Sequence, residues 1–189
     1  VKKEKMRIET LSGIKNVDLI VENKTVIGIK VDMGNPIFEY NRIPVIFPNI
    51  VKKELERLEI NFRNNKLYVY PISMGNPHAV CFVKDVQNLK IEDIGSRIES
   101  YKYFPNKTNV EFVEVVNPKN LKMRVWERGV GETLGCGTGA CAASVVSYFK
   151  KSTNREVIVD LPGGKLKVLY FENENNVKLI GDCSYIFEG

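Results

Sequence analysis

The sequence predicts an α+β protein with two pseudo-symmetric lobes, each a curled mixed β-sheet or barrel wrapped around a central helix. Most of the 189 residues fall into short β-rich runs separated by turn residues. One helical stretch, residues 140–149, is rich in Ala and Ser and apolar on most sides, as in a helix enclosed by other structure. The motif Met-Gly-Asn-Pro occurs at residues 33–36 and again at 74–77, which favours a duplicated architecture.

The strands are predicted from runs of β-branched and aromatic residues bounded by Gly, Asn, Asp and Pro. The predicted strands are residues 6–10, 17–21, 25–32, 43–47, 58–62, 66–73, 79–83, 110–116, 121–126, 156–161, 165–171, 177–180 and 184–187. Two further segments have helical patterns. Residues 51–58 predict a short helix, and residues 91–101 place Ile91, Ile94 and Ile98 on one helical face.

The charge of the chain suits an anionic small molecule better than a nucleic acid. The chain has 28 Lys and Arg against 23 Asp and Glu, a net charge of +5. Its lysines alternate with acids or lie at the predicted ends of elements, so they form no single basic stripe. We therefore expect a small-molecule partner and no nucleic acid.

The cysteines favour a reducing compartment. Cys81, Cys136, Cys141 and Cys183 form no CxxC pair, and the chain has one histidine, so neither a metal site nor a disulfide framework is expected. The sequence contains no signal peptide and no apolar run of membrane-spanning length. We expect a cytoplasmic protein that does not contact a membrane.

A cysteine between glycines, at the start of the helix over residues 140–149, is the most specific chemical signal. The segment 135–142 reads Gly-Cys-Gly-Thr-Gly-Ala-Cys-Ala. Bare backbone lets main-chain N–H groups approach an anion, and the helix dipole favours negative charge there. The same field is expected to lower the pKa of Cys136 and make it a proton carrier or nucleophile. The alternative is a tight turn with a buried cysteine.

Four polar residues complete the pattern. His78 follows a turn, Asn109 begins a strand, and Glu127 and Arg128 lie side by side after a strand. Singly, each has an ordinary structural explanation: a satisfied histidine, a hydrogen bond at a strand start or a surface ion pair.

Taken together and in this order, the segments resemble the diaminopimelate epimerases, cofactor-independent amino-acid epimerases of lysine biosynthesis. The matching stretches are Met-Gly-Asn-Pro-His at 74–78, Thr-Asn-Val-Glu-Phe at 108–112, Trp-Glu-Arg-Gly at 126–129 and Gly-Cys-Gly-Thr-Gly at 135–139, with residues 31–36 and 187–189 also similar. Proline and hydroxyproline racemases share the Cys-Gly-Thr-Gly loop, but they are not known for the Asn-Pro-His and Trp-Glu-Arg pairing.

The resemblance implies conversion of LL- to meso-diaminopimelate by two opposed cysteines, without metal or pyridoxal. One thiol removes the α-proton while the other delivers a proton to the opposite face. Cys136 corresponds to the second cysteine, and Glu127 and His78 are implied to modulate the two thiols. The implied substrate-binding residues are Asn76, Asn109, Glu127 and Arg128, with the backbone N–H groups of Gly137 and Thr138 under the reacting carboxylate.

The family's first catalytic cysteine, in a Cys-Gly-Asn-Gly motif, has no counterpart here. Cys81, Cys141 and Cys183 read as packing residues. We therefore expect a chain that lacks roughly the first third of a family member and is inactive alone. Residues 1–37 would be the remnant of the first lobe, with residues 182–189 returning to it, and residues 38–181 would form the catalytic lobe. A homodimer is compatible with this arrangement.

Three other functions are compatible with parts of the pattern. The first is a racemase for another amino acid, such as proline or hydroxyproline, on the same fold. The second is a cysteine-dependent hydrolase or acyl transferase, which would form a thioester on Cys136. The third is a binding or assembly module without activity, which leaves the combination of His78, Glu127 and Cys136 unexplained.

Overall fold

A single curled β-sheet organises the molecule. The computed structural model describes residues 4–10, 13–48, 55–63 and 65–184. The sheet has twelve strands in the order β1-β2-β3-β12-β11-β10-β8-β7-β6-β5-β4, with β9 paired to β8. The neighbours β6–β7 and β8–β10 are parallel, and the other pairs are antiparallel. This mixed sheet with its helices confirms the predicted α+β class.

The elements follow the predicted β-rich runs closely. The strands are β1 (Lys5–Thr10), β2 (Gly13–Glu22), β3 (Thr25–Gly34), β4 (Leu58–Phe62), β5 (Asn65–Ser73), β6 (Pro77–Phe82), β7 (Asn109–Asn117), β8 (Asn120–Glu127), β9 (Gly131–Thr133), β10 (Glu156–Leu161), β11 (Gly164–Phe171) and β12 (Asn176–Asp182). The helices are α1 (Ile91–Glu99), α2 (Gly137–Phe149) and the short 3-10 helix η1 (Glu172–Glu174).

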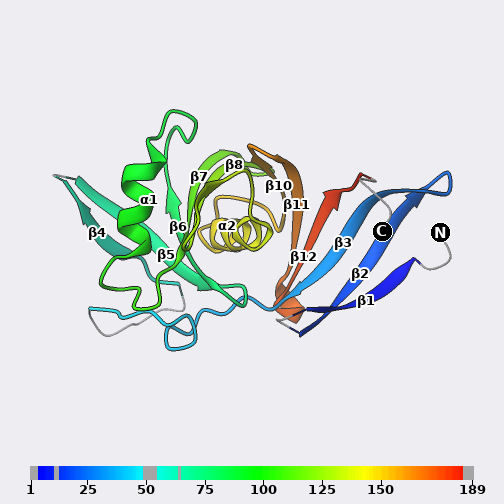
Figure 1. Cartoon of the computed structure of the whole chain (residues 1–189), viewed down its shortest axis with the longest axis horizontal. Helices are drawn as coiled ribbons and strands as arrows, with labels where there is room; N and C mark the ends of the chain where they lie inside the picture. Colours follow the sequence, from blue (N-terminus) through cyan, green and yellow to red (C-terminus); the bar gives the residue numbers. More distant parts are fainter. Residues whose placement is uncertain (1–3, 11–12, 49–54, 64, 185–189) are drawn as a thin grey trace.

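Helix α2 lies inside the curve of the sheet (Figure 1) and contacts β5, β6, β7, β8, β10, β11 and β12. Its small side chains explain this position. Ala140, Ala142 and Ala143 are fully buried, as are Val145 and Val146. A helix lined with alanine on several sides lets strands approach it from several directions. The predicted sheet around a central helix is therefore confirmed for this part of the chain.

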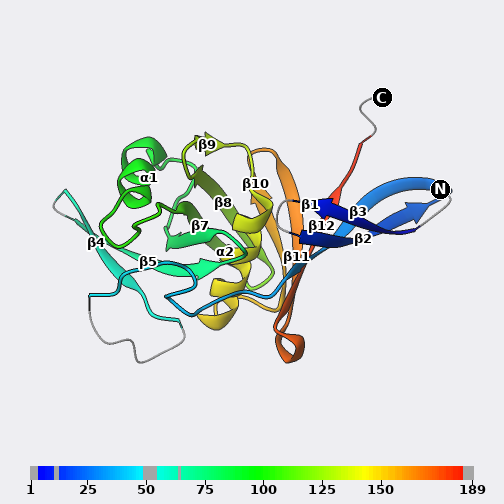
Figure 2. The same cartoon turned by 60° about the horizontal axis from the view of Figure 1, so that its bottom comes forward.

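Helix α1 covers the other face of the same sheet (Figure 2), where it contacts β4, β7, β8 and β9. Strand β7 separates the two cores because its side chains alternate between the two faces. Val113 packs with the core around α2, whereas Phe112 packs with Ile91 and Ile98 of α1. The predicted helix over residues 91–101 is confirmed, with its end at Glu99.

Strands β1, β2 and β3 project from this body as a ribbon (Figure 1). They stay in the same sheet because β3 pairs with β12, for example Val31 with Leu179. The structure therefore has one lobe around one helix plus this ribbon. The second pseudo-symmetric lobe, and the division into residues 1–37 and 38–181, stay predictions.

The two Met-Gly-Asn-Pro motifs form the same local turn. Gly34 and Gly75 both have positive φ, +82° and +97°, a conformation that glycine adopts without strain. In each turn the glycine N–H donates to a side-chain oxygen two residues earlier, on Asp32 at 3.0 Å and on Ser73 at 3.1 Å. The sequence repeat is therefore also a repeat of structure.

One predicted strand is wrong. Residues 43–47 lie in a turn and an irregular segment, since Pro44 cannot donate a ladder hydrogen bond and Ile43 N donates to Glu39 O instead. Ile43 and Val45 are nevertheless buried, so the apolar alternation reflects a loop packed on the core.

The helix predicted over residues 51–58 is wrong where it is described: residues 55–57 are not helical and Leu58 begins β4. Residues 51–54 and most of the strand predicted at 184–187 lie outside the described residues, as do residues 185–189 of the segment expected to return to the first lobe. The short strand β9 was not predicted.

Candidate active site

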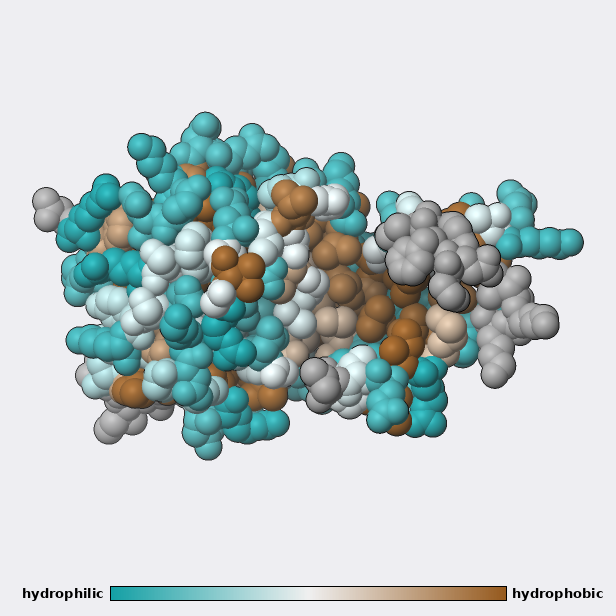
Figure 3. Space-filling model, viewed as in Figure 1, coloured by the Kyte–Doolittle hydropathy of each residue, from teal (hydrophilic) through white to brown (hydrophobic). Residues whose placement is uncertain are grey.

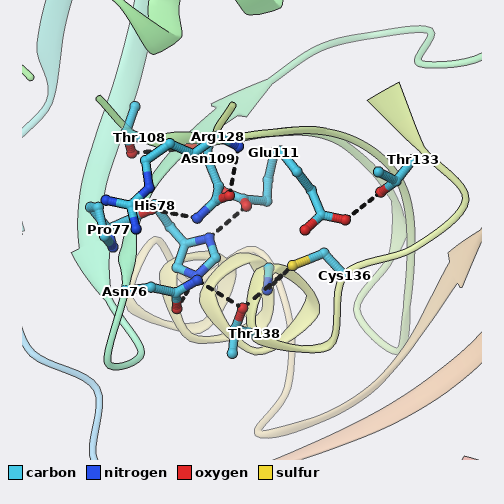
Figure 4. A network of polar contacts seen from close by, with 12 residues as sticks. Asn76, Pro77, His78, Thr108, Asn109, Glu111, Arg128, Thr133, Cys136 and Thr138 are labelled. Carbon is cyan, nitrogen blue, oxygen red and sulfur yellow. Dashed lines mark hydrogen bonds and ion pairs between the residues drawn. The ribbon is translucent and has the colours of Figure 1, made fainter. Parts of the chain in front are cut away.

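Cys136 is the N-cap residue of α2 (Figure 4). Its Sγ accepts a hydrogen bond from the N–H of Gly139 at 3.4 Å and lies 3.4 Å from Oγ1 of Thr138. The N–H groups of Gly137 and Thr138 have no hydrogen-bond partner among the described residues, as is usual for the first turn of a helix. Two donors and the positive end of a helix therefore lie beside the thiol.

The surroundings of Cys136 raise the pKa of its thiol, contrary to the expectation from the helix dipole. Burial is the largest cause, because it penalises the charged thiolate. The carboxylates of Glu111 and Glu127 raise the pKa further, whereas the hydrogen bonds from Thr138 and Gly139 lower it. The helix start thus offsets part of the burial cost without reversing it.

His78 is fully buried on β6, and its ring makes two polar contacts (Figure 4). Nδ1 lies 2.6 Å from Oε1 of Glu111, and Nε2 lies 2.9 Å from Oδ1 of Asn76. Asn76 Nδ2 in turn donates to Oγ1 of Thr138 at 3.4 Å. The structure therefore connects Asn76 and His78, which were predicted from one motif, to the loop that carries Cys136.

Asn109 joins two chain segments at the edge of the site. Its Nδ2 donates to the carbonyl of Pro77 at 2.9 Å, and its Oδ1 accepts from the backbone N–H of Arg128 at 2.9 Å. The side chain of Arg128 donates to the carbonyl of Asn106 at 3.3 Å. These contacts hold the Asn-Pro-His turn and the Trp-Glu-Arg turn in one place.

Glu127, at the end of β8, accepts a hydrogen bond from Oγ1 of Thr133 at 2.5 Å. Thr133 belongs to the short strand β9, which pairs with β8 just before the glycine loop. The structure thus brings Glu127 to the same site as Cys136, as the pattern of motifs predicts. Binding of a substrate by these residues stays a prediction.

Two functional candidates were missed from the sequence. Glu111 is fully buried against His78, and Glu99 of α1 is buried behind the Trp126–Gly129 turn. A carboxylate near the start of the apolar strand 110–116 was the available signal for Glu111. Glu99 carried no such signal, because a carboxylate at the end of a helix usually lies in solvent.

Two of the three other cysteines, Cys81 and Cys141, are buried in the core, as predicted for packing residues. Cys81 and Cys141 are almost fully buried, and burial raises the pKa of Cys81 to about 12 and that of Cys141 as well. Cys183 is half-buried. Within the described ranges, no group of three His, Cys, Asp or Glu residues lies close enough together to hold a metal ion. No helix of the described part of the chain is long and apolar enough to cross a membrane.

Comparison with known proteins places this site in a family. The sequence model described as diaminopimelate epimerase matches residues 70–186, which include β6, β7, β8 and the loop before α2. The chain belongs to the diaminopimelate epimerase family. It is 45% identical over 188 residues to the diaminopimelate epimerase of Acetivibrio thermocellus and 42% identical over 187 residues to that of Methanococcus maripaludis strain C6.

In both comparisons the match covers 99% of this chain but 66% of the relative. The chain thus spans just under two thirds of the length of these epimerases. Among solved structures, the fold is similar to a probable proline racemase from Agrobacterium radiobacter, with a TM-score of 0.66, 11% identity, and coverage of 96% of this chain and 59% of that one. A PhzF-family phenazine biosynthesis protein from Bacillus anthracis is similar at a TM-score of 0.61 and 16% identity, with coverage of 96% and 66%.

Proposed function

We propose that this chain carries half of the proton-transfer machinery that interconverts LL- and meso-diaminopimelate without a cofactor. The single observation that carries the proposal is the placement of Cys136 at the start of α2, beside the N–H groups of Gly137 and Thr138, which have no hydrogen-bond partner among the described residues. The name of the A. thermocellus relative supplies the substrate. As a biosynthetic enzyme of this kind, the protein would act in the cytoplasm.

The geometry suits removal of a proton next to a carboxylate. A substrate carboxylate over Gly137 and Thr138 would meet two N–H donors and the positive end of α2. Negative charge develops on that carboxylate as the α-carbon loses its proton, so the same donors stabilise the transition state. The two donors belong to the two residues that follow Cys136, and the sulfur of Cys136 would face the α-carbon.

The high pKa of Cys136 is compatible with this role. A proton carrier must both release and accept a proton, and a thiol that strongly favours the charged form would donate poorly. Glu127 would oppose ionisation of the thiol, and Thr138 would favour it. Arg128 is proposed to bind the carboxylate at the distal, non-reacting end of the substrate, where a guanidinium grips both oxygens.

The opposite proton carrier is proposed to be a cysteine of the first lobe, outside this chain. We therefore expect no epimerisation by the 189 residues alone. Turnover is expected when the chain is extended at its N-terminus by roughly the first third of the A. thermocellus relative; this form is called the extended protein below. A homodimer would not supply this cysteine, because a second copy repeats the same residues.

Incubation with diaminopimelate, proline and hydroxyproline separates the candidate substrates. We expect the extended protein to interconvert LL- and meso-diaminopimelate, resolved by chiral chromatography, and to leave both imino acids unchanged. Turnover of proline instead would assign the other racemase activity. A stable mass adduct on Cys136 after incubation with acyl esters, without epimerisation, would assign a hydrolase or acyl transferase.

A further inference from the structure

Glu111 is a buried carboxylate to which the proposed reaction gives no role. Its Oε1 lies 2.6 Å from Nδ1 of His78, and both side chains are fully buried. Nε2 of His78 lies 2.9 Å from Oδ1 of Asn76. Both ring nitrogens therefore face oxygen acceptors. A histidine ring donates to two acceptors only when both of its nitrogens carry a proton.

The carboxylate of Glu111 lies beside the first turn of α2. A Cβ at Gly139 would lie 2.8 Å from Oε1 of Glu111, so the carboxylate occupies the space that this glycine leaves free at the first turn of the helix. The positive end of a helix stabilises a nearby anion. The second oxygen, Oε2, is buried without a hydrogen-bond partner among the described residues. The ring of His78 is therefore the charged partner that the structure offers to this carboxylate.

The contacts continue from His78 to Cys136. Asn76 Nδ2 donates to Thr138 Oγ1 at 3.4 Å, and that oxygen lies 3.4 Å from Sγ of Cys136. With two protons on the ring, all donors can point the same way: the ring to Asn76, the amide to Thr138, and the hydroxyl to sulfur. A chain of donors ending at sulfur favours the thiolate.

We propose that Glu111 is a positioning residue that keeps His78 doubly protonated, so that Asn76 and Thr138 direct hydrogen-bond donors toward Cys136. The catalytic role of Glu111 rests on the proposed function, whereas the protonation state of the His78 ring is independent of that function. The titratable groups that face this network are Glu111 from β7, Glu127 from β8 and Cys136 from the start of α2.

The chain offers a direct test, because His78 is its single histidine. In the 189-residue chain labelled with ¹⁵N-histidine, the ring nitrogen shifts at pH 7 belong to His78 alone. We expect both nitrogens to have the shifts of protonated nitrogen. A ring with one protonated nitrogen would overturn the proposal, and this result needs neither a variant nor turnover.

Glu111→Gln removes the charge and keeps the size of the side chain. At a fixed pH we expect the ratio of doubly to singly protonated His78 ring to fall at least about tenfold, which is as large as the effect of raising the pH by one unit. Glu114→Gln is the matched control. Glu114 also lies on β7, but on the opposite face of the sheet from Glu111, and its carboxylate accepts a hydrogen bond from the N–H of Val86 at 3.1 Å. Its ring spectrum should equal that of the wild type. An unchanged ring in a folded Glu111→Gln protein would contradict the proposal.

Kinetics of the extended protein separate this inference from the proposed function. Glu111→Gln should lower kcat with little change in KM, because Glu111 acts through His78 and does not touch the substrate. Glu114→Gln should change neither constant. Absence of turnover in the wild type would contradict the proposed function and leave the ring spectrum intact. Normal turnover with a singly protonated ring would contradict only the role of Glu111.

Discussion

Cys136 is a thiol whose surroundings act on its ionisation in opposite directions. Burial and the carboxylates of Glu111 and Glu127 raise its pKa, whereas Thr138 and the N–H of Gly139 lower it. The balance explains why the expectation from the helix dipole alone was wrong. The helix start can be predicted from the residues next to Cys136. The burial of the thiol and its closeness to Glu111 and Glu127 depend on strands that are distant in the sequence and come together only in the fold.

Replacing Thr138 by Ala should make Cys136 less reactive. The hydroxyl favours the thiolate, so its loss raises the pKa and lowers the thiolate fraction at a given pH. The loss of a hydrogen bond changes the free energy of thiolate formation by about 0.5–1.5 kcal/mol, so alkylation by iodoacetamide at pH 8 should be about twofold to about tenfold slower. The measurement is the rate of modification of the Cys136 peptide by mass spectrometry.

Thr138→Ser is the control for this prediction, since it keeps the hydroxyl and should retain the rate of the wild type. The wild-type rate should continue to rise above pH 9, the ordinary pKa of a cysteine, because the pKa of Cys136 lies higher. Faster alkylation of Thr138→Ala would contradict the described hydrogen bond.

At the scale of elements, α1 holds the turn that carries two of the candidate residues. Glu99, near the end of α1, accepts hydrogen bonds from Nε1 of Trp126 at 2.8 Å and from the N–H of Gly129 at 2.9 Å. The indole also packs on Gly95, where a Cβ would lie 2.6 Å from the ring. Glu127 lies between these two anchors, so a helix on the far face of the sheet fixes its position.

Glu99→Ala should therefore destabilise the fold and loosen the turn. Two donors in a part-buried region would lose their acceptor, which costs about 1–3 kcal/mol in the free energy of unfolding. Urea unfolding followed by circular dichroism measures this change. Glu92→Ala on the exposed side of α1 is the control and should change stability by less than about 0.5 kcal/mol. Equal effects of the two variants would contradict the anchoring role.

Element prediction from the sequence succeeded where side-chain periodicity and burial agreed. Helix α2 was predicted from a stretch rich in Ala and Ser that is apolar on most sides, and most strands were predicted from runs of β-branched and aromatic residues between turn residues. The strand at 43–47 was wrong because Ile43 and Val45 fill the core from a loop. The structure brings Asn76 and His78 to the loop of Cys136, and the roles of the predicted site residues stay predictions. Glu111 was missed, because only the pairing of β6 with β7 places it against His78.

At the scale of the whole molecule, the ribbon of β1, β2 and β3 exposes apolar surface. Cross-strand pairs place Met6, Val17, Val31 and Leu179 on one face, on which Met6 is exposed and Val17 is buried. Figure 3 shows hydrophobic residues gathered over β11, β12 and β3, beside the lobe around α2. Ile8, on the same face as Met6, is 45% exposed. These residues form a contiguous apolar patch, in contrast to the single exposed apolar residues that are common on protein surfaces.

Replacing Ile8 by Ser should lower the binding of a hydrophobic dye without changing the core. The side chain is on an edge strand, so its loss removes apolar surface and leaves no buried cavity. Fluorescence of 1-anilinonaphthalene-8-sulfonate measures the change. Ile158→Ser is the control, because Ile158 is similarly exposed at 41% but belongs to β10. A larger loss of dye binding in the control would contradict this assignment of the patch.

The central claim is that Cys136 transfers the α-proton of the substrate. The most direct measurement is deuterium incorporation at the α-carbon of diaminopimelate in heavy water, with the extended protein and its Cys136→Ala variant compared by mass spectrometry and chiral chromatography. We expect exchange and epimerisation in the wild type and a loss of epimerisation of about 10²-fold or more in the variant, with unchanged circular dichroism. Epimerisation at the wild-type rate in the folded variant would contradict the account.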